Sequence, residues 1–163
     1  MGFWHNKHGQ ALIDSFNGGP NSTALANWLA ATFPNMYGAS AGNGNLTGKT
    51  NSMVAGFYLT LFAQHGLDAQ VLATALNVYS TTSSLGGTAA EQYGFSVTAD
   101  GLGASSYNVG SAGAAFGVAN NTELTVIQIL QGANQQAVSG VLYGGNASLR
   151  GLANTVYSGI NGV

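Results

Sequence analysis

Apolar side chains recur every three or four residues along most of the chain, which is the spacing of one face of an α-helix. Glycine, proline, asparagine and serine, which interrupt or cap helices, separate these stretches. The pattern predicts a mainly α fold, a compact bundle of five to six helices over residues 9–17, 21–33, 51–65, 67–79, 122–138 and 146–160.

The two central stretches have the strongest periodicity. The first places Val54, Phe57, Tyr58, Leu61 and Phe62 on one face, and the second places Val71, Leu72, Ala75, Leu76 and Tyr79 inward. Thr50 is expected to cap the first helix and Asp68 the second, because both side chains can accept a hydrogen bond from a free backbone N–H. The very short turn between the two stretches predicts a helical hairpin.

The texture changes between residues 83 and 121, where glycine, serine and alanine dominate. Residues 95–98 alternate between apolar and polar side chains as a strand does, Asp100 and Gly101 form a turn signal, and residues 105–109 could return as the partner strand. We therefore expect a small β-hairpin near residues 95–109. No linker or shift in composition divides the chain, which predicts a single helical domain over residues 1–163.

Only 5% of the 163 residues are charged, against about 25% in a typical soluble domain. Three basic residues cannot build the patch that nucleic-acid binding or a polybasic membrane contact requires. No apolar run approaches the ~20 residues of a membrane span. Cysteine is absent, which excludes a disulfide framework and a thiolate zinc site.

The abundance of asparagine, serine, threonine and glycine is typical of bacterial surface and secreted proteins, so we expect an extracellular or cell-surface location. No signal peptide is visible at the start of the sequence. If the protein is exported, we expect that signal elsewhere in a parent chain.

The opening residues Gly2-Phe3-Trp4-His5-Asn6, together with residues 28–34 and 71–79, resemble helical modules of large bacterial surface proteins. Those proteins often carry SdrD B-like, collagen-like or other adhesin-type repeats. The resemblance implies a location and a context, and it carries no catalytic assignment.

Two short motifs resemble enzyme signatures. Residues 38–42 satisfy the Gly-x-Ser-x-Gly pattern around Ser40, but a hydrolase elbow needs a strand before that serine and a helix after it. Residues 48–50 end like a phosphate-binding loop, although the required first glycine is replaced by Asn43. The favoured interpretation is a loop in the first case and a helix cap by Thr50 in the second.

The N-terminal segment is the other candidate site. His5 and His8 are three residues apart and would share a divalent metal if they lay on one helical turn, with Lys7 between them and Trp4 beside them. The favoured alternative is a polar turn that hydrogen-bonds its own backbone while Trp4 fills the bundle, without a cofactor. A buried isopeptide bond from Lys7 or Lys49 is a further hypothesis.

Aromatic residues in glycine-rich stretches are candidates for an exposed binding face, namely Tyr37, Tyr107 and Tyr143. Together these features predict a non-catalytic binding or structural module with an adhesion-like role, whose partner is a surface protein or a glycan. The alternatives are a serine or metal-dependent hydrolase and a self-assembling surface element, since a surface with few charges favours homotypic association.

Overall fold

A computed structural model describes residues 2–162 and confirms the mainly helical fold. The α-helices are α1 (Gly2–His5), α2 (Lys7–Ser15), α3 (Ala24–Thr32), α4 (Pro34–Tyr37), α5 (Asn51–Ala63), α6 (Leu67–Thr81), α7 (Ser83–Gly86), α8 (Val126–Gln136) and α9 (Ala147–Ile160). The 3-10 turns are η1 (Phe16–Gly18), η2 (Gly42–Gly44), η3 (Ala89–Tyr93), η4 (Leu102–Ala104), η5 (Gly110–Phe116) and η6 (Leu142–Gly145). The strands are β1 (Ser106–Asn108) and β2 (Glu123–Thr125).

The number of helices exceeds the predicted five to six. Of the longer helices, α3, α5, α8 and α9 fall within the predicted stretches, whereas α2 begins two residues earlier and α6 ends two residues later than predicted. The additional helices are single turns such as α4, which begins at Pro34. Pro34 ends α3 as expected, but its fixed φ also suits the first position of a new helix.

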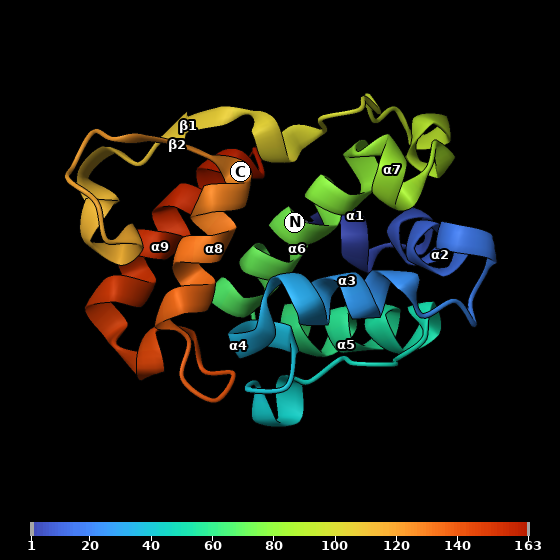
Figure 1. The fold of residues 1–163 in the computed structure, drawn as a ribbon, viewed down its shortest axis with the longest axis horizontal. Helices are drawn as coiled ribbons and strands as arrows, with labels where there is room; N and C mark the ends of the chain where they lie inside the picture. Colours follow the sequence, from blue (N-terminus) through green and yellow to red (C-terminus); the bar gives the residue numbers. More distant parts are fainter. Residues whose placement is uncertain (1, 163) are drawn as a thin grey trace.

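Helix α6 runs through the middle of the molecule (Figure 1). Helices α8 and α9 lie on one side of it, and α5 and α7 pack on the other. Nearly every side chain of α6 is buried, including the polar side chains of Gln70 and Thr74. A helix that is enclosed on all sides must pair its polar groups internally, because water cannot reach them.

A stripe of three polar side chains on α6, which we call the α6 stripe, consists of Gln70, Thr74 and Asn77. The Trp4 indole N–H donates to Asn77 Oδ1 at 2.9 Å, and Asn77 Nδ2 donates to Asn161 Oδ1 at 3.1 Å. Asn161 Nδ2 donates in turn to Gln70 Oε1 at 2.8 Å, and the Thr74 hydroxyl lies 3.1 Å from Asn161 Oδ1. The stripe thereby ties α1 and the residue that follows α9 to the central helix.

Several helix starts follow the local sequence signals. The Thr50 hydroxyl accepts a hydrogen bond from the Met53 backbone N–H and caps α5. Asn146 caps α9 in the same way through the Leu149 N–H. The prediction that Asp68 caps α6 is wrong, because α6 begins at Leu67 and its N-cap is Gly66. Asp68 lies instead in the first turn of α6, where the helix dipole stabilises a negative charge.

The predicted β-hairpin near residues 95–109 is only partly present. Strand β1 exists, but it pairs antiparallel with β2, with Tyr107 opposite Leu124. Residues 95–98 form no strand, because they are bound to the end of α6: the Thr98 N–H donates to the Thr81 carbonyl at 2.9 Å. Leu124 consequently belongs to a strand, and the helix predicted over 122–138 begins at Val126.

Candidate ligand-binding pocket

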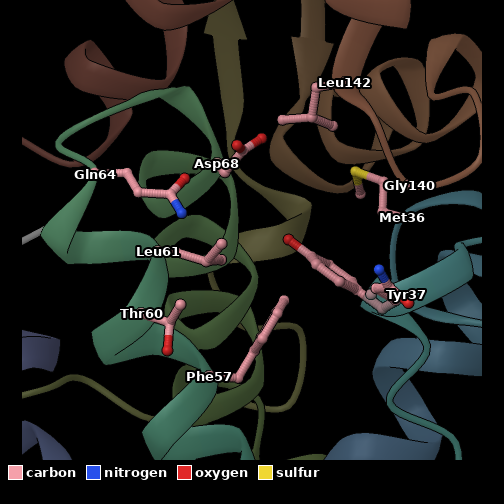
Figure 2. Close-up of a pocket in the computed structure, with 11 residues that line it drawn as sticks. Met36, Tyr37, Phe57, Thr60, Leu61, Gln64, Asp68, Gly140 and Leu142 are labelled. Carbon is pink, nitrogen blue, oxygen red and sulfur yellow. The ribbon is translucent and has the colours of Figure 1, made fainter.

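A pocket of about 270 Å³ opens where α4, α5 and the start of α6 meet the turn at residues 138–142 (Figure 2). We call it the Tyr37 pocket. Its apolar lining comes from Met36, Phe57, Leu61 and Leu142, and its polar lining comes from Tyr37, Asn43, Thr60, Gln64 and Asp68. A concave apolar surface with a few polar groups is the usual composition of a ligand site.

The Tyr37 side chain is the most unusual group in this pocket. It is 5% exposed, and its hydroxyl makes no hydrogen bond to any described residue. Figure 2 shows the hydroxyl pointing from α4 toward the part of the pocket where Leu61 and Asp68 lie. Burial first, and the nearby Asp68 carboxylate second, raise the pKa of Tyr37 far above its ordinary value. The phenol therefore stays neutral and can act as a hydrogen-bond donor inside the pocket.

Asp68 brings the only carboxylate among the residues that line the Tyr37 pocket. Its Oδ2 lies 3.7 Å from Nη2 of Arg150, and both side chains are partly exposed. Arg150 also donates from Nη1 to the Leu142 carbonyl at 3.2 Å. The arginine thus connects α9, α6 and the wall of the pocket, although an ion pair at this exposure contributes little to stability.

A tight turn forms one wall of the Tyr37 pocket. Val138 and Val141 exchange two backbone hydrogen bonds of 2.9 Å, and the two residues between them have φ angles of 51° and 85°. Two positive φ angles define the turn that best suits a two-residue hairpin. The second of these residues, Gly140, packs so closely that an added Cβ would lie 2.2 Å from the Ala41 carbonyl oxygen. The wall is therefore held against the loop that follows α4.

The prediction that Tyr37 and Tyr143 are exposed is wrong, because each is 5% exposed. Their glycine-rich surroundings are short helical turns packed on the core rather than open loops. Tyr143 has a φ of 57° and a buried hydroxyl without a hydrogen-bond partner among the described residues. Tyr107 is half-buried in β1. Of these three predicted tyrosines, Tyr37 is the one that lines the pocket.

The N-terminal candidates do not form one cluster. Trp4 is 1% exposed and belongs to the core, so its ring offers no surface for a ligand. Asn6 caps α2 and interrupts the helix, which removes the expected single turn between His5 and His8.

The two imidazoles contact different aromatic rings. The His5 ring stacks on Phe62 with centroids 4.0 Å apart, whereas the His8 ring lies 5.6 Å from that of Tyr93. Within residues 2–162 no group of three or more histidine, aspartate or glutamate side chains could hold a metal ion. A two-histidine metal site therefore stays a prediction.

The enzyme-like motifs lie in ordinary local structure. Ser40 is exposed in a turn that follows helix α4, so neither the strand nor the helix of a hydrolase elbow is present around it. Residues 48–50 lead into the Thr50 cap of α5, as predicted. Lys7 and Lys49 are both exposed, which removes the burial that the isopeptide hypothesis requires.

Sequence reasoning missed Phe57 and Leu61 as pocket residues because it assigned both to the core face of the helix. In the structure Val54 and Tyr58 fill the core, while Phe57 and Leu61 are only partly buried and face the pocket. The available signal was that this helix is apolar on more than one face. A helix of that kind has a second apolar surface to cover.

No family model, curated protein or solved structure matches the chain. Within residues 2–162 no helix combines the length and the apolar character needed to cross a membrane.

Proposed function

We propose that this protein is a non-catalytic binding module of a secreted or cell-surface bacterial protein, and that the Tyr37 pocket receives its ligand. The observation that carries the proposal is the Tyr37 hydroxyl, which has no hydrogen-bond partner among the described residues and points into an apolar pocket. The ligand expected from this geometry joins an apolar group to a hydrogen-bond acceptor.

The energetic reason is that a ligand covering the pocket would shut water away from this hydroxyl, and a polar group that is then buried without a partner costs about 1–3 kcal/mol. An acceptor atom of a ligand would satisfy the phenol, while its apolar part would cover Phe57 and Leu61. Binding would therefore pair the phenol and remove these apolar side chains from water at the same time.

The proposed location is supported by the sequence. The chain has few charges and many amide and hydroxyl side chains, and its first residues resemble modules of large bacterial surface proteins. Protease treatment of intact cells of the source organism, followed by detection of the module with an antibody, tests this part. Protection of the module in intact cells and its digestion only after lysis would contradict a surface location.

The pocket is tested by two-dimensional NMR of the isotope-labelled protein titrated with N-isobutylacetamide, which joins a branched apolar group to a carbonyl acceptor. We expect saturable shifts confined to α4, α5 and residues 138–142. The variant Tyr37→Phe should bind about two- to tenfold more weakly, which is the range of one hydrogen bond. Tyr107→Phe is the matched control and should bind like the original protein.

The amine isobutylammonium serves as a second probe because it keeps the branched group and lacks the carbonyl. Equal affinity for both probes, or an unchanged affinity in Tyr37→Phe, would contradict the proposed role of the phenol.

A further inference from the structure

A second hollow continues the Tyr37 pocket along α5. It has a volume of about 300 Å³ and is lined by Asn43, Asn45, Leu46, Lys49, Met53 and Phe57. Asn43 and Phe57 line both hollows. We call the two together the α5 groove.

The floor of the α5 groove is a row of apolar side chains on α5. Met53, Phe57 and Leu61 are spaced by four residues and therefore lie on one side of the helix. Met53 is 55% exposed although it is large and apolar. From Met53 to Leu61 the helix rises by about 12 Å, which an extended peptide spans with about four residues.

Charge is concentrated at this groove. The chain has three lysine and arginine residues and a net charge of −2. Lys49 lines one end of the groove, and Arg150 lies at the other end, where it is paired with Asp68. Lys49 is exposed and forms no ion pair within the described part of the chain. The Lys49 end of the groove therefore offers an uncompensated positive charge on a protein with negative net charge.

The lining favours a peptide over a saccharide. Leu46, Met53 and Leu61 present aliphatic and thioether surface, which buries apolar side chains well but leaves sugar hydroxyls without partners. The exposed amides of Asn43 and Gln64 can each donate and accept, as the backbone of an extended peptide requires.

We infer that the α5 groove binds an extended segment of a partner protein, with an apolar side chain in the Tyr37 pocket and an acidic side chain about four residues away at Lys49. This inference rests on the proposed function and adds the class of ligand and its charge. The acidic side chain would neutralise Lys49, and the segment would cover Met53 and Phe57.

Selection of random peptides displayed on phage, with the immobilised complete chain as bait, tests the inference. The original protein should enrich peptides in which Asp or Glu stands about four residues from a large apolar residue. The variant Lys49→Glu should enrich Lys or Arg at that position instead. Lys7→Glu makes the same charge change at the other lysine and should select the same peptides as the original protein.

Affinity measurements on one selected peptide separate the two proposals. Replacing its acidic residue by the amide, or Lys49 by Gln, should each weaken binding about two- to fivefold at low salt, and the two changes together should have no further effect. If binding depends on Tyr37 but not on Lys49 or the acidic residue, the inference is wrong and the proposed pocket stands. If neither Tyr37→Phe nor Lys49→Gln changes binding, both are wrong.

Two other occupants would also overturn the inference. One is a glycan that binds on an array, loses affinity with Tyr37→Phe and displaces the peptide. The other is a second copy of this chain, which concentration-dependent sedimentation would reveal if Met53→Gln abolished the association.

Discussion

The α6 stripe and the Tyr37 pocket treat polar groups in opposite ways. In the stripe Gln70, Thr74 and Asn77 all have hydrogen-bond partners, and the Trp4 indole N–H is paired as well. In the pocket the Tyr37 hydroxyl has no hydrogen-bond partner among the described residues, although the Tyr37 side chain is only 5% exposed. Polar groups are thus paired within the protein in the stripe, whereas the Tyr37 hydroxyl is left open to the pocket.

We interpret the difference as that between polar groups that stabilise the fold and a polar group that, under the proposed function, binds a ligand. Removing a partner from the stripe leaves other buried groups unpaired, so the loss falls on stability. Removing the Tyr37 hydroxyl leaves no protein group unpaired, so the loss should fall on binding. The following predictions test that distinction in order of decreasing effect.

Alkaline pH should have the largest effect on stability, because it acts both on a buried tyrosine with a hydrogen-bond partner, such as Tyr157, and on one without a partner among the described residues, such as Tyr37. Burial raises the pKa of Tyr37, Tyr143 and Tyr157 above the ordinary value of 10.0. The unfolded chain therefore loses these protons first. The free energy of unfolding therefore has its full value below about pH 10. Above that pH it declines by about 1.4 kcal/mol per pH unit for each tyrosine that stays protonated in the folded state.

Urea unfolding followed by circular dichroism at a series of pH values measures this decline. In Tyr37→Phe the free energy of unfolding should decline less steeply with pH, because one tyrosine fewer contributes to the decline. An unfolding midpoint that stays constant well above pH 10 would contradict the prediction.

Asn77→Ala should cost about 2–3 kcal/mol, because it leaves the Trp4 indole N–H buried without a partner and deprives Asn161 of a donor. Asn154→Ala, on the exposed side of α9, is the control and should change stability by less than about 0.5 kcal/mol. Urea unfolding of both variants gives the comparison. Equal unfolding midpoints for the two variants would show that the hydrogen bonds of Asn77 do not stabilise the fold.

Gly140→Ala should destabilise the wall of the pocket by about 1–3 kcal/mol, because its new Cβ would meet the Ala41 carbonyl oxygen at 2.2 Å. Gly145 also has a positive φ, of 81°, but no atom lies within 4 Å of its would-be Cβ. Gly145→Ala therefore carries the backbone strain without the collision. Hydrogen exchange at residues 138–142 should speed up in the first variant only, and equal exchange in both would refute the role of the contact.

The smallest expected effect is the difference in stability between two tyrosine-to-phenylalanine variants. The Tyr157 hydroxyl donates to the Ile129 carbonyl at 2.8 Å, so Tyr157→Phe should cost about 1 kcal/mol. Tyr37→Phe should change stability by less than about 0.5 kcal/mol, or raise it, because no hydrogen bond is lost. Thermal unfolding measures both variants. A larger loss in Tyr37→Phe than in Tyr157→Phe would show that Tyr37 has a structural partner.

Local signals in the sequence predicted the helices well. Thr50 and Asn146 cap helices because a cap depends only on residues three positions away. The hairpin depended on distant contacts and was predicted only in part: β1 lies within residues 105–109 as expected, but it pairs with β2 and not with residues 95–98. Gly101 shows why: an added Cβ there would lie 2.0 Å from the Thr82 hydroxyl oxygen, so the expected turn is packed on the end of α6.

The candidate site was only partly predictable for the same reason. Tyr37 was named from the sequence, but as an exposed residue, because its glycine-rich surroundings did not reveal that the chain turns back onto the core. Gln70, Thr74 and Asn77 form a regular polar stripe that is typical of a solvent-facing side. Their true position follows from Asn161, about 90 residues away in the sequence, and no local pattern carries that information.

The hydrogen bond between Asn77 and Asn161 joins two parts of the chain that are synthesised at different times. The central helix is made near the middle of the chain, but the amide that satisfies its polar side chains emerges only after α9. A nascent chain halted before α9 would leave the face of α6 that packs on α9 uncovered and Gln70 without its partners Ser158 and Asn161, and we expect protease to digest it readily. Completion of this module is therefore a late step, reached only when its final helix has been made.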